Sequence, residues 1–143
     1  MAHVLIVDDE EGIRAVLARL VTGAGHTVTE APDADSALRA LETQEANVAL
    51  CDVRMPGHDG VWLVEEVRRR FPAVGLLFVT AETRLPPAST LKQGVVAYVL
   101  KPFNKDAILA AIGSALAWNE TARKSPQRPP VDDALTAWLN EDI

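Results

Sequence analysis

Five short, mostly apolar runs alternate along the chain with longer segments of helical pattern, and this alternation restricts the fold more than any other feature. The runs are rich in β-branched residues and have the length of strands buried on both faces. They are His3–Val7, His26–Glu30, Val48–Cys51, Val74–Val79 and Val95–Leu100. Short buried strands alternating with helices indicate an α/β fold, a parallel sheet covered by helices. Because crossovers are right-handed, we expect a doubly wound sheet of five parallel strands.

Helix ends in the sequence agree with this order. Gly23 and Gly25 end the first helical segment, and Asp33 begins the second. Asn104 is a reasonable cap for the last helix. A short helix is expected from about Pro87 to Gln93.

Polar residues stand where the predicted strands end. Asp8 and Asp9 follow the first strand, Asp52 follows the third, Thr80 follows the fourth and Lys101 follows the fifth. The carboxyl ends of parallel strands meet at one edge of the sheet, where ligands bind in such folds. We therefore expect three carboxylates, a hydroxyl and an ammonium group to converge at this edge.

This set of groups suits phosphoryl transfer assisted by a cation. Acids held close together repel one another, and a divalent cation relieves that conflict. Mg²⁺ is the best candidate, with Mn²⁺ as the alternative, because Mg²⁺ uses carboxylates, waters and phosphate oxygens. A carboxylate such as Asp52 can attack phosphorus to give an aspartyl phosphate. Lys101 and Thr80 can then neutralise and bind the phosphoryl oxygens.

The motifs resemble those of response-regulator receiver domains of two-component signalling, over about residues 1–118. They are Leu5-Ile6-Val7-Asp8-Asp9-Glu10, Cys51-Asp52-Val53-Arg54-Met55-Pro56-Gly57, Asp59-Gly60, Thr80-Ala81 and Tyr98-Val99-Leu100-Lys101-Pro102-Phe103. Each motif alone is weak, but five in order, each near a strand end, are very specific. The resemblance implies a (βα)5 flavodoxin-like receiver fold.

The resemblance also implies roles for single residues. Asp52 is the phosphoacceptor, Asp9 binds Mg²⁺ directly, and Asp8 assists. The metal ligands are therefore Asp8, Asp9, Asp52 and the backbone carbonyl of Arg54. Thr80, Ala81 and Lys101 bind the phosphoryl group, and Thr80 and Tyr98 form the switch pair. The Lys101-Pro102 peptide bond is expected to be cis.

Three functions remain to be separated. The first is a switch phosphorylated by a histidine kinase or a histidine phosphotransfer protein, with output through the fourth helix, fifth strand and fifth helix. A variant of this function is a shuttle that passes the phosphoryl group on to a histidine phosphotransfer protein. The second is a small Mg²⁺-dependent phosphohydrolase, for which the sequence offers no evident general base. The third is a scaffold, which would not need every site residue. We expect no enzymatic activity other than self-phosphorylation from a phosphodonor and autodephosphorylation.

Composition restricts the partners and the location. The formal net charge of −6 argues against direct binding of nucleic acid. We interpret the adjacent Arg68, Arg69 and Arg70 as a solvated helix end. The single cysteine, Cys51, excludes an intramolecular disulfide and is expected to be a buried apolar residue. No apolar run is long enough to span a membrane, and we expect a cytoplasmic protein.

Three features depart from the common pattern. Arg54 and Glu82 are expected to form an ion pair that overhangs the acceptor and slows dephosphorylation. The prolines in 84–87 stiffen the loop after Thr80, which either limits its rearrangement or has no effect. Residues 119–143 contain a proline-rich linker and a predicted amphipathic helix from about Asp132 to Asn140. That helix is expected to pack on its own receiver, to pair in a homodimer, or to bind a partner after phosphorylation. The output target is unknown, and the chain resembles either a single-domain receiver or a piece of a longer protein.

Overall fold

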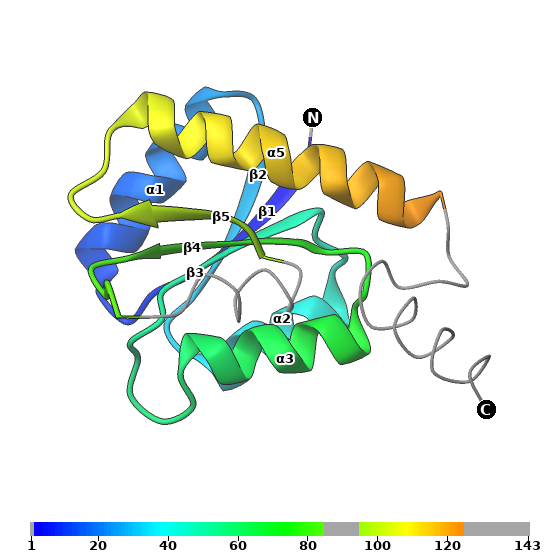
Figure 1. Ribbon diagram of the computed structural model, residues 1–143, viewed down its shortest axis with the longest axis horizontal. Coiled ribbons are helices and arrows are strands. Elements are labelled where there is room, and N and C mark those ends of the chain that lie inside the picture. The colour runs from blue at the N-terminus through cyan, green and yellow to red at the C-terminus, as the bar shows by residue number, and fades with distance from the viewer. Residues whose placement is uncertain (1, 85–94, 125–143) are drawn as a thin grey trace.

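The strands form one parallel sheet in the order β2-β1-β3-β4-β5 (Figure 1). The computed structural model describes residues 2–84 and 95–124. The strands are β1 (His3–Val7), β2 (Thr27–Ala31), β3 (Val48–Cys51), β4 (Gly75–Thr80) and β5 (Val95–Leu100). Every neighbouring pair is parallel, which confirms the predicted doubly wound sheet. The strand order reverses between β1 and β3, so the carboxyl ends of these strands form the ligand-binding edge.

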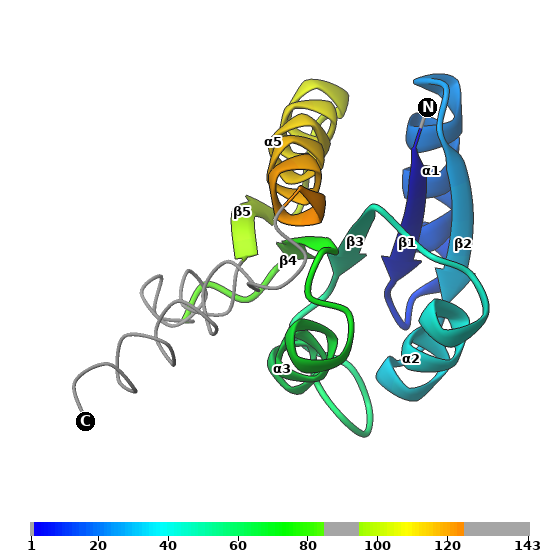
Figure 2. The ribbon, with the colours of Figure 1, turned by 90° about the vertical axis from the view of Figure 1, so that its right-hand side faces the viewer.

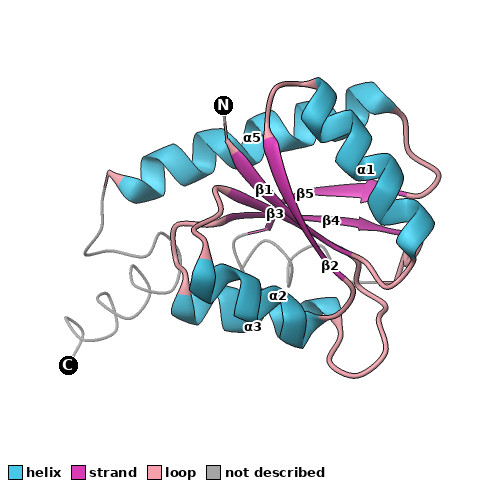
Figure 3. Cartoon of the chain, turned by 180° about the vertical axis from the view of Figure 1, so that it is seen from behind, coloured by secondary structure: helices cyan, strands magenta, loops and turns pink. Residues whose placement is uncertain are grey.

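Helices cover both faces of this sheet (Figures 1 and 2). The helices α1 (Glu11–Gly23) and α5 (Lys105–Arg123) lie on one face. The helices α2 (Ala34–Thr43) and α3 (Gly60–Arg70) lie on the other, as the view from behind also shows (Figure 3). Each face of the sheet therefore has its own apolar cluster. The short helix predicted near Pro87 and the predicted tail helix lie outside the described residues.

Side-chain caps explain where three helices begin. Asp33 accepts a hydrogen bond from the Ser36 amide at the start of α2, at 2.7 Å. Asp59 and Asn104 cap α3 and α5 in the same way. Each cap satisfies an amide that the helix itself leaves unpaired. Within the described ranges, no helix is long and apolar enough to cross a membrane.

The helix α5 continues to Arg123, past residue 118, where the sequence suggested that the receiver ends. Its last turns belong to the fold because Asn119 and Ala122 are buried. The Asn119 side chain accepts a hydrogen bond from Asn47 at 3.1 Å and donates one to the Ala73 carbonyl. The helix therefore makes buried contacts beyond residue 118, and the predicted division of the chain at that residue stays a prediction.

The interpretation of Arg68 as part of a solvated helix end was wrong. Arg68 is buried, and its guanidinium donates hydrogen bonds to the carbonyls of Pro72 and Val74. It also lies 4.3 Å from the centre of the Trp118 ring. Arg68 therefore links the end of α3 to α5, whereas Arg69 and Arg70 pair with Glu66 and Glu42 nearer the surface.

Candidate functional site

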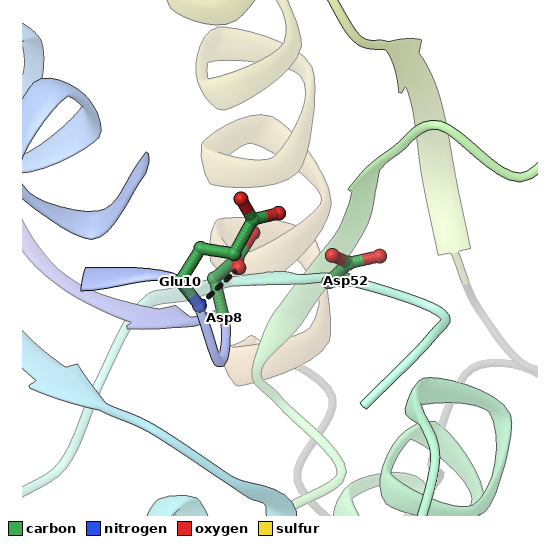
Figure 4. A group of neighbouring side chains, drawn as sticks. All are labelled: Asp8, Glu10 and Asp52. Atoms are coloured by element: carbon green, nitrogen blue, oxygen red, sulfur yellow. Dashed lines mark hydrogen bonds between the residues drawn. The ribbon is translucent and has the colours of Figure 1, made fainter. Parts of the chain in front are cut away.

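Three carboxylates meet at the carboxyl edge of the sheet (Figure 4). Asp8 directly follows β1, and Asp52 directly follows β3, the neighbouring strand. One oxygen from each of Asp8, Glu10 and Asp52 lies within 4.8 Å of the others. Asp8 and Asp52 are buried, whereas Glu10 is exposed. The convergence expected from the sequence is therefore present for Asp8 and Asp52.

Lys101 lies between the two buried acids. Its ammonium nitrogen is 2.8 Å from Asp8 Oδ2 and 2.9 Å from Asp52 Oδ2. Burial alone would lower the pKa of Lys101, but the hydrogen bonds to Asp8 and Asp52 outweigh burial and raise this pKa. Burial raises the pKa of Asp8, which the hydrogen bond from Lys101 only partly offsets. Lys101 is therefore the cation that pairs with both buried carboxylates, and the cluster of Asp8, Glu10 and Asp52 offers oxygen atoms that could hold a metal ion.

Three hydrogen bonds fix the backbone around Asp52. The Asp52 amide donates to the Val7 carbonyl at 3.0 Å, and Asp52 Oδ1 accepts from the Arg54 amide at 3.1 Å. The Gly60 amide donates to the Val53 carbonyl at 2.8 Å. A Cβ at Gly60 would collide with the Asp52 carbonyl oxygen. The glycine therefore permits α3 to begin directly against the acceptor loop.

Asp9 is exposed, whereas its neighbour Asp8 is buried. The Asp9 side chain lines an open pocket of about 500 Å³ together with Asp52, Arg54 and Lys101. Asp9 is not part of the three-carboxylate cluster, in which Glu10 stands instead. The direct metal role of Asp9 and the role of the Arg54 carbonyl stay predictions. Sequence reasoning gave no role to Glu10, although its position next to the acidic pair was a signal.

Thr80 and Tyr98, the predicted switch pair, are connected through Glu82. Thr80 is fully buried, and its hydroxyl accepts a hydrogen bond from the Glu82 amide at 3.1 Å. The Tyr98 hydroxyl donates to the Glu82 carbonyl, and the Tyr98 ring lies 5.9 Å from that of Phe78. Burial is the first cause that raises the pKa of Tyr98, followed by the negative charge of Glu82. The loop after β4 thus contacts both Thr80 and Tyr98.

The predicted ion pair between Arg54 and Glu82 is present, with 2.8 Å between Nη1 and Oε2. The structure adds a second arginine, because Arg84 Nε lies 3.0 Å from Glu82 Oε1. Hydrogen bonds from Arg84 and then from Arg54 lower the pKa of Glu82 to about 2. Glu82 therefore stays ionised, and two guanidinium groups flank the mouth of the acceptor pocket.

Two further sequence predictions are confirmed near the site. The peptide bond between Lys101 and Pro102 is cis. Cys51 is buried, and burial raises the pKa of its thiol to about 12. The Cys51 side chain is therefore a small apolar group beside Asp52 and not a reactive thiol. Ala81 lines the same pocket as Thr80.

Comparison with known proteins agrees with the geometry. Residues 4–113 match the family model of the response regulator receiver domain. The DNA-binding transcriptional regulator NtrC of Klebsiella pneumoniae is 36% identical over 137 residues, covering 95% of this chain and 29% of that protein. The CheY-like receiver domain protein of Methanospirillum hungatei JF-1 superposes with a TM-score of 0.79 at 29% identity, covering 85% of this chain and 98% of that chain. The response regulator TrrA of Thermotoga maritima, solved in complex with Mg²⁺-BeF, gives 0.74 at 26% identity, covering 81% of this chain and 100% of that chain.

The fold and the site together define a receiver module of two-component signalling. The chain belongs to the response regulator receiver domain family. It spans 29% of the length of the NtrC protein that it matches.

Proposed function

We propose that Asp52 accepts a phosphoryl group from a histidine kinase or a histidine phosphotransfer protein and that this changes partner binding. The observation that carries this proposal is the position of the Lys101 ammonium within 3 Å of both buried carboxylates, at 2.8 and 2.9 Å. An ammonium group at this place can bind the new phosphoryl oxygens when Asp52 becomes an aspartyl phosphate. A buried acid without a neighbouring cation would be a poor place to add further negative charge.

The transfer step uses Asp52 as the nucleophile. A carboxylate oxygen of Asp52 attacks phosphorus and forms a phosphorus–oxygen bond, while the bond from phosphorus to the donor nitrogen breaks. The electron pair of the broken bond goes to the donor nitrogen, so an imidazole ring that is protonated at its other nitrogen leaves as neutral imidazole. Lys101 moves with the new phosphoryl oxygens, and the Thr80 hydroxyl donates to one of them after it releases the Glu82 amide. No general base is needed for this step.

The carboxylates fit a divalent cation. Asp8, Glu10 and Asp52 offer oxygen donors within 4.8 Å of one another, and Asp9 lines the same pocket as Asp52. Oxygen donors of this kind suit Mg²⁺, and Mn²⁺ is the alternative. When bound, the cation supplies charge neutralisation for the phosphoryl oxygens. The complex of the relative TrrA with Mg²⁺-BeF supports this choice.

We propose that the ion pair between Arg54 and Glu82 slows loss of the phosphoryl group by restricting the attacking water. The pair is exposed on the Arg54 side and contributes little to stability. Arg54→Ala and Glu82→Ala should each shorten the lifetime of the phosphorylated protein. Arg39→Ala, an exposed arginine on α2, is the control. Unchanged decay rates in both variants would remove this role.

The partners and location are proposed on the same basis. Output through β5 and α5, the described part of the expected surface, suits a receiver whose Tyr98 lies on β5. The relatives named NtrC are DNA-binding regulators, so an attached output module of that kind is one proposal for the natural context. Direct nucleic-acid binding by this chain is not proposed, since its net charge is −6. The cytoplasmic location and the homodimer stay predictions.

Incubation with a small phosphodonor and Mg²⁺ tests the function. Intact mass should increase by one phosphoryl group in the wild-type chain and should not change for Asp52→Asn. Turnover of a phosphate ester without a stable adduct would favour the phosphohydrolase. A wild-type chain that never gains this mass would refute the proposal.

A further inference from the structure

Arg14 contacts the backbone of the loop that carries Asp8 and Asp9. It belongs to the first turns of α1, and only 14% of its side chain is exposed. Its Nη1 donates a hydrogen bond of 2.6 Å to the backbone carbonyl of Asp8. Its Nε lies 3.4 Å from Glu30 Oε1 on β2. The guanidinium therefore joins α1, the loop after β1 and the strand β2.

The other polar groups of Asp8 are also engaged. Its Oδ1 accepts from the Glu10 amide at 2.9 Å, and its Oδ2 accepts from Lys101 at 2.8 Å. Its amide donates to the Ala31 carbonyl at 3.2 Å. The carbonyl held by Arg14 belongs to the planar peptide that leads into Asp9. The direction of that carbonyl therefore restricts where the next residue points.

Asp9 depends on this backbone for its direction. Its carboxylate is exposed, and among the described residues it forms no hydrogen bond and no ion pair. Rotation of the peptide between Asp8 and Asp9 would move the Asp9 side chain relative to Asp52. Nothing else in the described structure restrains that rotation as directly as the Arg14 hydrogen bond does.

We propose that Arg14 is a positioning residue for the metal site: it fixes the peptide between Asp8 and Asp9 so that the Asp9 carboxylate faces the pocket of Asp52. This inference rests on the proposed function, because it assigns Asp9 to the divalent cation. Arg14 touches neither the carboxylate oxygens of the site nor the phosphoryl group. Its effect is transmitted through the backbone.

The sign of the effect separates positioning from simple electrostatics. Arg14 is a positive charge near a cation site, so its removal should strengthen Mg²⁺ binding if charge alone matters. If Arg14 positions the loop, its removal should weaken Mg²⁺ binding instead. Loss of a group that orients a metal ligand typically weakens affinity by about tenfold or more.

The test measures Mg²⁺ affinity of the full chain by isothermal titration calorimetry, with Mg²⁺ alone as the ligand. Arg14→Met keeps the aliphatic stem but loses the guanidinium, and we expect the dissociation constant to rise by about tenfold. Arg19→Met is the matched control, because Arg19 is an exposed arginine on the same helix. The control should stay within about twofold of the wild type. Arg14→Gln, which is shorter and polar, should weaken binding in the same direction and gives a second result if Arg14→Met does not fold.

Phosphorylation kinetics provide a second readout. The labelling rate of Arg14→Met at saturating Mg²⁺ should stay within about twofold of the wild type, with the Mg²⁺ concentration for half-maximal rate raised. A dissociation constant that is unchanged or lower in both Arg14 variants would overturn the inference. A wild-type chain that binds no Mg²⁺ would instead refute the proposed function, so the two failures are distinct.

Discussion

Replacement of Lys101 by methionine should destabilise the protein in a strongly pH-dependent way. The Lys101 ammonium lies 2.8 Å from Asp8 and 2.9 Å from Asp52, and both acids are at least 95% buried, with 1% and 5% exposure. At these distances each contact is worth about 6 kcal/mol before desolvation, at an effective dielectric constant near 20. The cost of removing the Lys101 ammonium from water cancels part of this Coulomb energy. Removal of one partner from a buried ionic group typically costs about 3–5 kcal/mol, and we expect about 3 kcal/mol at pH 7 because the site opens to a pocket.

The pH dependence follows from Asp8. Burial already raises the pKa of Asp8 above the ordinary 3.8, and the hydrogen bond from Lys101 opposes that rise. Without Lys101, the folded-state pKa of Asp8 is higher still. An acid with a raised pKa contributes stability below its ordinary pKa and loses it as the pH rises through the folded-state value. The penalty of Lys101→Met should therefore be small near pH 3.8 and complete at pH 7.

Urea denaturation in the presence of a metal chelator, at both pH values, measures the free energy of unfolding. Lys105→Met is the control, because Lys105 is an exposed lysine on α5, and it should change the stability by less than about 0.5 kcal/mol. Equal destabilisation by Lys101→Met at both pH values would refute the reasoning. It would mean that the lysine stem contributes by packing and not by its charge.

Three further changes test separate parts of the structure. Gly60→Ala places a methyl group against the Asp52 carbonyl and should lower the free energy of unfolding by about 1–3 kcal/mol while slowing phosphorylation; a fully active, equally stable variant would show that the close approach is unimportant. Asn119→Ala removes the donor to the half-buried Ala73 carbonyl and should lower the free energy of unfolding by about 1 kcal/mol in thermal denaturation, whereas an unchanged midpoint would place the last turns of α5 outside the fold. Cys51, with a thiol pKa of about 12, should react with a thiol reagent only as fast as the protein unfolds, and rapid modification of the folded chain would argue against its burial.

Much of the fold could be predicted from the sequence because its strands are continuous apolar runs with clear ends. The predicted bounds of β1, β3 and β5 agree with the structure. The strand β2 begins at Thr27 and not at His26, because the His26 amide donates to the Val21 carbonyl at the end of α1 and the ladder with β1 starts at Thr27. Differences of one residue at strand ends are ordinary. Alternation and handedness predicted the doubly wound parallel sheet, and the structure supplies the strand order β2-β1-β3-β4-β5.

What the sequence did not reveal depends on contacts between distant residues. Arg68 looked like a surface residue because its neighbours in sequence are arginines, yet its ring partner is Trp118 on another helix. The last turns of α5 were assigned to the tail because the partners of Asn119 lie at residues 47 and 73. The position of the Glu10 carboxylate beside Asp8 and Asp52 depends on the fold and is not evident from the sequence. Residues at strand ends, by contrast, could be placed from topology.

The central claim is that the strand-end acids hold a cation so that Asp52 alone can be esterified by phosphorus. Borohydride reduction of the phosphorylated chain, followed by peptide mass mapping, identifies the labelled side chain directly. We predict modification at Asp52 only, dependent on Mg²⁺ and abolished by a chelator. Label on Asp8, Asp9 or Glu10, or labelling of Asp52 at the same rate without a divalent cation, would contradict the account.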